Sequence, residues 1–256
     1  MAGQLKSRQR LSKERELDTP SGTPAPLLPK RGMAKPQRRT GTRAAAAEAT
    51  REAILRAATK VFAKYGYVGG SVEKISSAAK SVDRMIYYYF GSKEGLFVAV
   101  LEDIYRRMDE AESRLALDES KPLQALAELI RFVVRYYRDH PEFVTLLNTE
   151  NLHKGKHITK SSRARDYSHH AVTVTGRLLN CGVECGLIRS GIDARQLYLL
   201  IAAAGYFHTS NRYTLGAFLG EAIDTPEAVA RWEAFVVDSV LRIVAAHPEA
   251  LPQLPP

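Results

Sequence analysis

The sequence predicts an all-α protein with an N-terminal helix-turn-helix domain of three helices and a larger C-terminal helical domain. Apolar residues recur three and four positions apart through most of the chain beyond residue 43, whereas the alternation typical of strands is scarce. Two short helical segments follow a long one and are separated by a tight turn, which is the helix-turn-helix arrangement. Longer segments with the same helical period fill the C-terminal half.

Residues 1–43 differ in composition from the rest of the chain. They hold 11 basic and 3 acidic residues, so most of the formal net charge of +9 belongs to this segment. They also hold five prolines and few large apolar side chains, which predicts a disordered tail. A basic tail strengthens binding to nucleic acid by counterion release, or it is a solvated extension; its acidic residues count against a transit peptide.

Residues 44–100 are predicted to form the first domain. We expect helices over 44–65, 71–79 and 82–89, followed by a long helix that begins after Ser92. Gly66 ends the first helix because glycine adopts a left-handed backbone without steric cost. Ser71 and Ser92 are good N-caps, since a serine hydroxyl accepts a hydrogen bond from the first turn of a helix.

Residues 101–247 are predicted to form the second domain, and residues 248–256 a flexible end. The expected segments are a helix from Pro122 to His140, another from Pro141, a loop over 155–165, and helices over 166–186, 193–210 and 226–246. The last two are too apolar for one side to face water, so they lie at the centre of the monomer or in a four-helix bundle with a second subunit. The small residues at 202–205 allow close helix approach.

The most informative pattern lies between residues 54 and 97. Its residues are Ile54, Leu55, Ala57, Ala58, Phe62, Gly66, Tyr67, Ser71, Val72, Ile75, Ala79 and the run IYYYFGSKEGLF from Ile86 to Phe97. The pattern resembles the DNA-binding domain of the TetR family of regulators, in which the final run reads (L/I)-Y-x-(H/Y)-F-x-(S/N)-K-E-x-L. That run is specific and matches at nearly every position. The motifs resemble the family over residues 47–100, and the rest resembles it in architecture.

The turn between the two short helices departs from the family pattern. Where the family has Gly-Val-Ser, this chain has Lys80-Ser81-Val82. The turn glycine commonly takes a left-handed conformation, which Lys80 adopts only at a steric cost. Val82 replaces the usual capping serine, so Ser81 is an alternative cap.

The resemblance implies that the second short helix enters the major groove of DNA. The expected DNA contacts are Ser71, Lys74, Asp83, Arg84, Met85, Tyr87, Tyr88, Tyr89 and Lys93. Arg84 suits guanine O6 and N7, and Met85 suits a thymine methyl group. Asp83 accepts from cytosine N4 or caps the helix.

The remaining contacts are expected to go mainly to the DNA backbone. By resemblance, Tyr87 and Tyr89 bond phosphates, while Tyr88 reaches a base or the backbone. Lys93 begins the next helix, where the ammonium and the backbone N–H groups both favour a phosphate. Ser71 and Lys74 hold the other strand. About one of the three tyrosines is expected to be an ordinary packing residue instead.

In the family resembled, the C-terminal helices form a dimer interface and a pocket for a small molecule. A ligand that favours another separation of the two reading helices weakens DNA binding, which implies a homodimeric repressor with an effector. Candidate pocket residues are Tyr136, Asn148, Asn151, His170, Tyr206 and His208, of which about two are expected to touch ligand. A faint resemblance around 136–143 to regulators of pyrimidine and nicotinate catabolism implies a planar heterocycle or an aromatic acid. The alternative is a DNA-binding regulator whose second domain only dimerises or binds a protein.

Other classes of protein find little support. No nucleophile–base motif or phosphate-binding glycine loop marks an enzyme, and no cofactor is expected. Four histidines at 153, 157, 169 and 170 lack a carboxylate or cysteine at ligand spacing, which disfavours a metal site. Cys181 and Cys185 are expected to be free thiols. The longest apolar run, 197–207, is too short for a membrane span and no secretory segment follows the N-terminus, so we expect a cytoplasmic protein.

Overall fold

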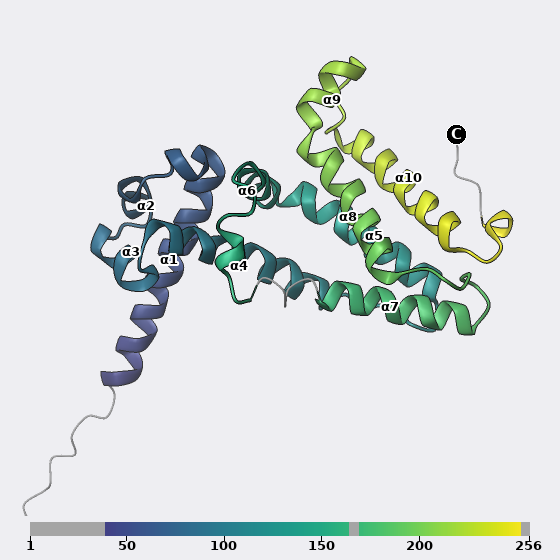
Figure 1. The fold of residues 1–256 in the computed structure, drawn as a ribbon, viewed down its shortest axis with the longest axis horizontal. Coiled ribbons are helices and arrows are strands. Elements are labelled where there is room, and N and C mark those ends of the chain that lie inside the picture. Colours follow the sequence, from purple (N-terminus) through teal and green to yellow (C-terminus); the bar gives the residue numbers. More distant parts are fainter. Residues whose placement is uncertain (1–38, 164–168, 252–256) are drawn as a thin grey trace, which may run out of the picture. The chain divides into compact units, whose positions relative to one another are not determined.

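The computed structural model describes residues 39–163 and 169–251, and these residues are helical almost throughout (Figure 1). The α-helices are α1 (Arg39–Gly69), α2 (Val72–Ala78), α3 (Asp83–Phe90), α4 (Lys93–Glu112), α5 (Pro122–Asp139), α6 (Pro141–Leu152), α7 (His169–Glu184), α8 (Ala194–Ser210), α9 (Arg212–Leu219) and α10 (Pro226–Val244). Two 3₁₀ turns, η1 (Ile158–Lys160) and η2 (Pro248–Ala250), complete the described part. The predicted all-α fold is confirmed.

The helices of the N-terminal part begin and end where local sequence signals place them. Ser71 caps α2 by accepting from Lys74 N, and Ser92 caps α4 by accepting from Gly95 N. Gly66 has φ 68°, so the chain kinks there as expected, although helical structure resumes to Gly69. Side chains from all four helices close one core. Its largest fully buried members are Ile54, Phe62, Ile75, Ile86, Leu96 and Phe97.

Several boundaries differ from the sequence prediction. Helix α1 begins at Arg39 rather than 44, and α9 was not expected because only Asn211 separates it from α8. The expected loop after α6 contains η1, and the first residues of the expected flexible end form η2. The predicted start of α7 at 166 and the tail before Arg39 lie outside the described residues. The predicted domain boundary at 100/101 falls inside α4 and stays a prediction.

Helix α5 lies at the centre of the C-terminal helices, packed against α8, α10 and α7 (Figure 1). The small residues of α8 permit this packing: a Cβ at Gly205 would stand 3.0 Å from Cδ2 of Tyr137 on α5. An antiparallel bridge between Ile188 and Ala245 ties the segment after α7 to the end of α10. The prediction of close helix approach at 202–205 is therefore confirmed.

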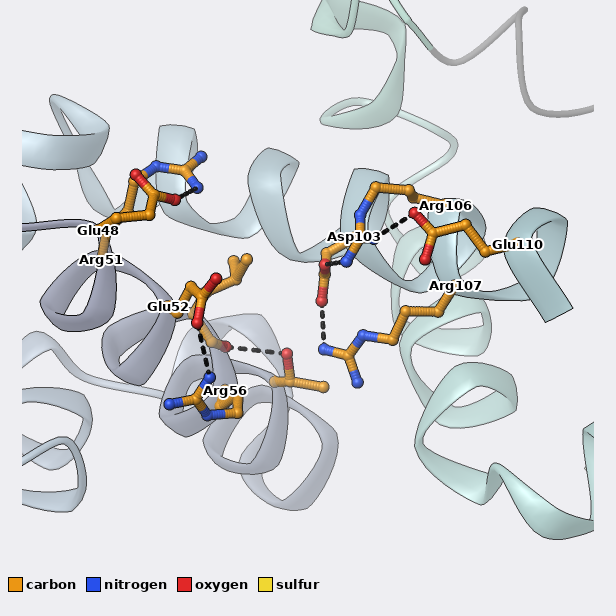
Figure 2. A network of polar contacts seen from close by, with 10 residues as sticks. Glu48, Arg51, Glu52, Arg56, Asp103, Arg106, Arg107 and Glu110 are labelled. Atoms are coloured by element: carbon orange, nitrogen blue, oxygen red, sulfur yellow. Dashed lines mark hydrogen bonds and ion pairs between the residues drawn. The ribbon is translucent and has the colours of Figure 1, made fainter. Parts of the chain in front are cut away.

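Helix α4 is continuous from the helix-turn-helix core to the C-terminal helices, and ion pairs stabilise it along its side. Asp103 is buried and accepts from both Arg106 and Arg107. Arg106 also meets Glu110, with 2.6 Å between Nη1 and Oε1. Figure 2 shows this network beside the pairs Arg51–Glu48 and Arg56–Glu52 of α1. Because such i,i+3 and i,i+4 pairs lie along one face, they favour a single straight helix.

A large apolar face remains exposed on α8, α9 and α10. Phe207, Phe218 and Phe235 are each more than half exposed. A further group of apolar side chains continues this face: Leu199, Leu200, Tyr213, Leu219 and Ile243. Soluble monomers rarely leave so many large apolar side chains of neighbouring helices in water, so we expect a partner to cover them. Within the described ranges, no helix combines the length and apolarity required to cross a membrane.

Candidate DNA-binding site

The turn between α2 and α3 is held by backbone and side-chain hydrogen bonds. Ser81 N donates to Ser76 O at 2.9 Å, and the hydroxyl of Ser76 donates to the carboxylate of Asp83. The second bond joins the two helices directly. It fixes the angle at which α3 leaves the turn.

The expected side-chain caps of α3 are wrong. Val82 occupies the N-cap position and makes no side-chain capping bond. Ser81 precedes that position by one residue, and the carboxylate of Asp83, the first residue of α3, is bonded to Ser76 instead. The start of α3 is thus held through this link to α2 and not through a side-chain cap.

Lys80 occupies the left-handed position of the turn, as the sequence predicts, with φ 51°. A side chain in this region costs about 1 kcal/mol relative to glycine. We expect Lys80→Gly to raise the free energy of unfolding by about 0.5–1 kcal/mol, less the entropy gained by the unfolded chain. Urea denaturation measures the change. Lys60→Gly, inside helix α1, is the opposite control and should destabilise; an unchanged or lower midpoint for Lys80→Gly would contradict the strain.

Helix α3 places one residue in the core and leaves polar side chains outside. Ile86 is fully buried, whereas Arg84 is exposed and takes part in no hydrogen bond or ion pair among the described residues. Tyr87 and Tyr88 are 52% and 75% exposed. The structure therefore brings a free guanidinium and two phenols together on the accessible side of a short, well-anchored helix.

Met85 and Tyr89 lie partly inside. Both are half-buried and pack against the core. The ring of Tyr89 meets that of Tyr88 edge to face at 5.0 Å between centroids. Tyr89 is thus the tyrosine of the three that packs most, which agrees with the expectation that one of them is a packing residue.

Two lysines flank the end of α1. Lys74 Nζ donates to Gly69 O at 2.8 Å and lies over the ring of Tyr65; Lys93 Nζ donates to Val68 O at 3.2 Å. Partial burial and the nearby charge of Lys74 lower the pKa of Lys93. Each ammonium retains donors that the protein does not use. The sequence does not predict that the carbonyl oxygens of Val68 and Gly69 accept from these lysines, because both contacts depend on the kink of α1.

Two family models and several known proteins are similar to this chain. A family model described as "Bacterial regulatory proteins, tetR family" matches residues 54–100, and one described as "Tetracyclin repressor-like, C-terminal domain" matches residues 122–240. The HTH-type transcriptional repressor NicS of Pseudomonas putida is 51% identical over 205 residues, which cover 80% of this chain and 97% of NicS. The chain belongs to the TetR family. It is a DNA-binding transcriptional regulator, as the helix-turn-helix motif predicts.

Two further proteins are similar to this chain, one in sequence and one in fold. The HTH-type transcriptional repressor SCO4008 of Streptomyces coelicolor is 30% identical over 160 residues, 62% of this chain and 78% of that protein. The crystal structure of a TetR transcription regulator from Haloarcula marismortui has a TM-score of 0.59 at 15% identity, covering 77% of this chain and 98% of that one. The second likeness concerns the fold alone.

The candidate pocket residues of this TetR-family chain do not gather at one place. Asn148 of α6 accepts from the hydroxyl of Tyr206 and donates to Ser210 Oγ at 3.0 Å, so two of them meet between α6 and α8. Tyr136 stacks on His140, with 4.0 Å between ring centroids, beside an open groove of about 520 Å³. His208 stacks on Trp232 and borders clefts of about 240 and 430 Å³. Asn151 is exposed, and His170 is half-buried on α7.

Sequence reasoning missed a buried acidic residue and its aromatic surroundings. Glu112, the last residue of α4, is only 4% exposed. Its charge acts on Tyr137 of α5 and Tyr198 of α8, whose pKa values are raised chiefly by burial. One carboxylate in a run of charged residues reads as solvated, so the sequence carries no signal for its burial.

A second buried acid, Glu150 of α6, anchors the segment that follows it. Its carboxylate accepts from the backbone N–H groups of His157 and Ile158 at 2.7 and 2.9 Å. Its other oxygen lies 2.7 Å from Nδ1 of His157, which is 1% exposed. The imidazole packs against Tyr67 and Phe97 at 4.4 and 5.0 Å between centroids. These contacts join α6 to the helix-turn-helix core, where the sequence predicted a polar loop.

Proposed function

We propose that this TetR-family regulator is a repressor that binds its operator through α3 and leaves it when a small molecule binds the C-terminal helices. The observation that carries the DNA-reading assignment is the unpaired, exposed guanidinium of Arg84 on α3. A free guanidinium at the N-terminal end of a reading helix suits bidentate bonding to guanine in the major groove. NicS and SCO4008, which are named as repressors, support the direction of control.

The other proposed DNA contacts are assigned according to how exposed each side chain is. Tyr87 and Tyr88 extend furthest from α3 and are assigned to phosphates and to the backbone or a base. Lys74 and Lys93 supply positive charge together at the end of α1, with Ser71 at the start of α2. Met85, Asp83 and Tyr89 are assigned nearby supporting contacts, since each is already partly engaged within the protein. Phosphate contacts fix the position of the helix, and Arg84 specifies the base.

The repressor is proposed to act as a homodimer through the apolar face of α8 and α10. Phe207 and Phe235 stand exposed on that face, and Trp232 lies between them beside His208. Two copies of such a helix pair bury their apolar sides in a four-helix bundle. A dimer of this kind presents two α3 helices to half-sites about one DNA turn apart.

The effector is proposed to be a planar heterocycle or an aromatic acid. Asn148 and Tyr206 are half-buried and meet between α6 and α8, where together with Ser210 they offer polar contacts to a ligand. Helix α6 also carries Glu150, whose contacts reach the helix-turn-helix core. A ligand that moves α6 therefore changes the support of that core.

Arg84→Ala tests the DNA-reading assignment. We expect the variant to lose about 10- to 100-fold of its preference for operator over random DNA, because one bidentate base contact is removed. Its salt dependence should change little, since the phosphate contacts remain. Binding to the upstream DNA of its own gene is measured across a salt series.

Arg177→Ala is the matched control, because Arg177 is a surface arginine of α7 paired with Glu119. It should bind like the wild type. If Arg84→Ala keeps the full preference for operator over random DNA, Arg84 makes no specificity contact and the assignment is wrong.

A further inference from the structure

One carboxyl oxygen of Glu112 differs from the other buried polar atoms of the described residues. Its Oε1 is the only buried side-chain nitrogen or oxygen among the described residues that has no hydrogen-bond partner. Buried polar atoms are almost always paired, because an unpaired one loses its bonds to water without replacement. An orphaned acceptor at the buried end of α4 therefore requires an explanation.

The surroundings of Glu112 are aromatic and polar rather than basic. The tyrosine cluster, defined as Tyr105, Tyr137, Tyr198 and Tyr206, lies on α4, α5 and α8. Glu112 acts electrostatically on Tyr137 and Tyr198, and Tyr105 acts on both of these. The ring of Tyr137 lies 6.2 Å from that of Tyr206. The phenols that feel the charge of Glu112 thus come from α5 and α8, and their raised pKa values keep them neutral.

No protein cation balances Glu112 in the described ranges. It takes part in no ion pair there, and the charge that acts on it most is the like charge of Asp109. Burial, reinforced by Asp109, raises the pKa of Glu112 to about 7. A purely structural carboxyl would be expected to have acquired a partner, as Asp103 has acquired Arg106 and Arg107.

The position of Glu112 at the end of α4 also bears on how a ligand reaches its carboxyl group. It is the last residue of α4, and the connection from Ser113 to Lys121 consists of turns and irregular backbone rather than a helix. Such a connection can open without breaking the packing of α5 against α8. We therefore expect a small ligand to reach the carboxyl from this connection rather than between α5 and α8.

We propose that Glu112 Oε1 recognises the effector by accepting a hydrogen bond from a ring N–H or aromatic O–H group of a small planar molecule held by the tyrosine cluster. This inference rests on the proposed function and narrows its effector class to donor-bearing aromatic rings. Aromatic walls favour a flat ring, and the single unpaired acceptor selects the edge that carries a donor. A site that must satisfy a buried acceptor rejects the same shape without the donor.

Two pairs of neutral probes of nearly equal shape test the donor requirement. 2-Pyridone and phenol carry an N–H or O–H donor, whereas N-methyl-2-pyridone and anisole have it blocked. Isothermal titration calorimetry on the full-length protein should find each donor at least tenfold tighter than its blocked counterpart. Equal binding of the two members, or no binding of either donor at millimolar concentration, would overturn the inference.

Variants then assign the preference to Glu112. Glu112→Leu, which has no acceptor, should lose the tenfold discrimination, while Glu112→Gln keeps an acceptor oxygen and should retain part of it. Glu110→Gln, an exposed carboxyl on the same helix paired with Arg106, is the control and should behave as the wild type. Discrimination that survives in Glu112→Leu would place the donor's partner elsewhere and overturn the assignment. The comparison of probes on the wild type stands even if Glu112→Leu does not fold.

The pH dependence of 2-pyridone binding gives an independent readout. A donor prefers the charged carboxylate, so affinity should rise as the pH passes from 6 to 8 through the pKa of Glu112, which is about 7. Asp109, Tyr137 and Tyr198 are the titratable groups that act on this carboxyl or feel its charge, and burial keeps the two phenols neutral over that range. Glu112→Gln should show a flat profile. An equal slope in both proteins would contradict the proposal.

Failure of this inference is distinguishable from failure of the proposed function. Release of operator DNA by N-methyl-2-pyridone, anisole or a compound without a donor would retain effector control but overturn the role of Glu112. Tight DNA binding that no small molecule alters would overturn effector control itself. Electrophoretic mobility shifts with the same probes separate these results.

Discussion

Phe235→Asp is expected to convert the repressor into a monomer and to reduce operator affinity at least 100-fold. Phe235 lies on α10, 56% exposed, in the apolar face shared with α8. A carboxylate there has to be desolvated among the apolar side chains of two copies. Two half-sites then bind independently, so the gain of about 10²- to 10⁴-fold that comes from joining two binding modules is lost.

Size-exclusion chromatography with light scattering measures the mass, and a mobility shift measures the affinity. Val183→Asp is the matched control, because Val183 is a 40% exposed apolar residue on α7 outside that face. It should remain a dimer with wild-type affinity. A dimeric Phe235→Asp that binds operator normally would move the interface away from α10, and a wild-type monomer would remove it altogether.

Glu150→Ala is expected to lower the free energy of unfolding by about 3 kcal/mol or more. The carboxylate holds two backbone N–H groups and the ring of a fully enclosed histidine, and alanine leaves all of them without a partner. For a protein of this size the loss corresponds to a fall in Tm of about 6–12 °C. Thermal unfolding followed by circular dichroism measures the shift.

Glu150→Gln is the graded comparison, because its carbonyl oxygen still accepts from both backbone N–H groups. It should cost less than half as much as alanine. Glu142→Ala, on the same helix α6 but outside the buried contacts, should leave Tm within about 1 °C of wild type, since surface substitutions usually change stability little. Equal Tm values for Glu150→Ala and Glu142→Ala would show that the buried acid does not anchor the segment.

Signals that act within one turn of chain are readable from the sequence. Ser71, Ser92, Asp193 and Thr225 cap the helices that follow them because their hydroxyl or carboxylate oxygens reach a backbone N–H three residues away. Lys80 has the backbone of the glycine it replaces for the same local reason. The TetR-type DNA-binding motif is equally local, which is why residues 54–100 are enough to indicate the family.

Contacts between distant segments are not readable in this way. His157 appears as one polar residue in a basic loop, and only its encounter with Glu150 and Tyr67 buries it. Aspartate is a common helix cap, yet the carboxylate of Asp83 accepts a hydrogen bond from the hydroxyl of Ser76, seven positions earlier. Among the candidate pocket residues, Asn148 and Tyr206 meet while Tyr136 and His208 turn to other surfaces, because helix rotation decides which side of α5 or α8 faces inward.

Because α4 is unbroken, a movement at its C-terminal end is transmitted to the helix-turn-helix core. Its 20 residues span about 30 Å, with Lys93 near the DNA-reading helix at one end and Glu112 among the tyrosines at the other. A tilt of about 5° around the far end therefore displaces the near end by about 2.5 Å, most of the rise of one base pair. In the proposed dimer two α4 helices make this movement, so we expect a small rearrangement around Glu112 to change the separation of the two α3 helices.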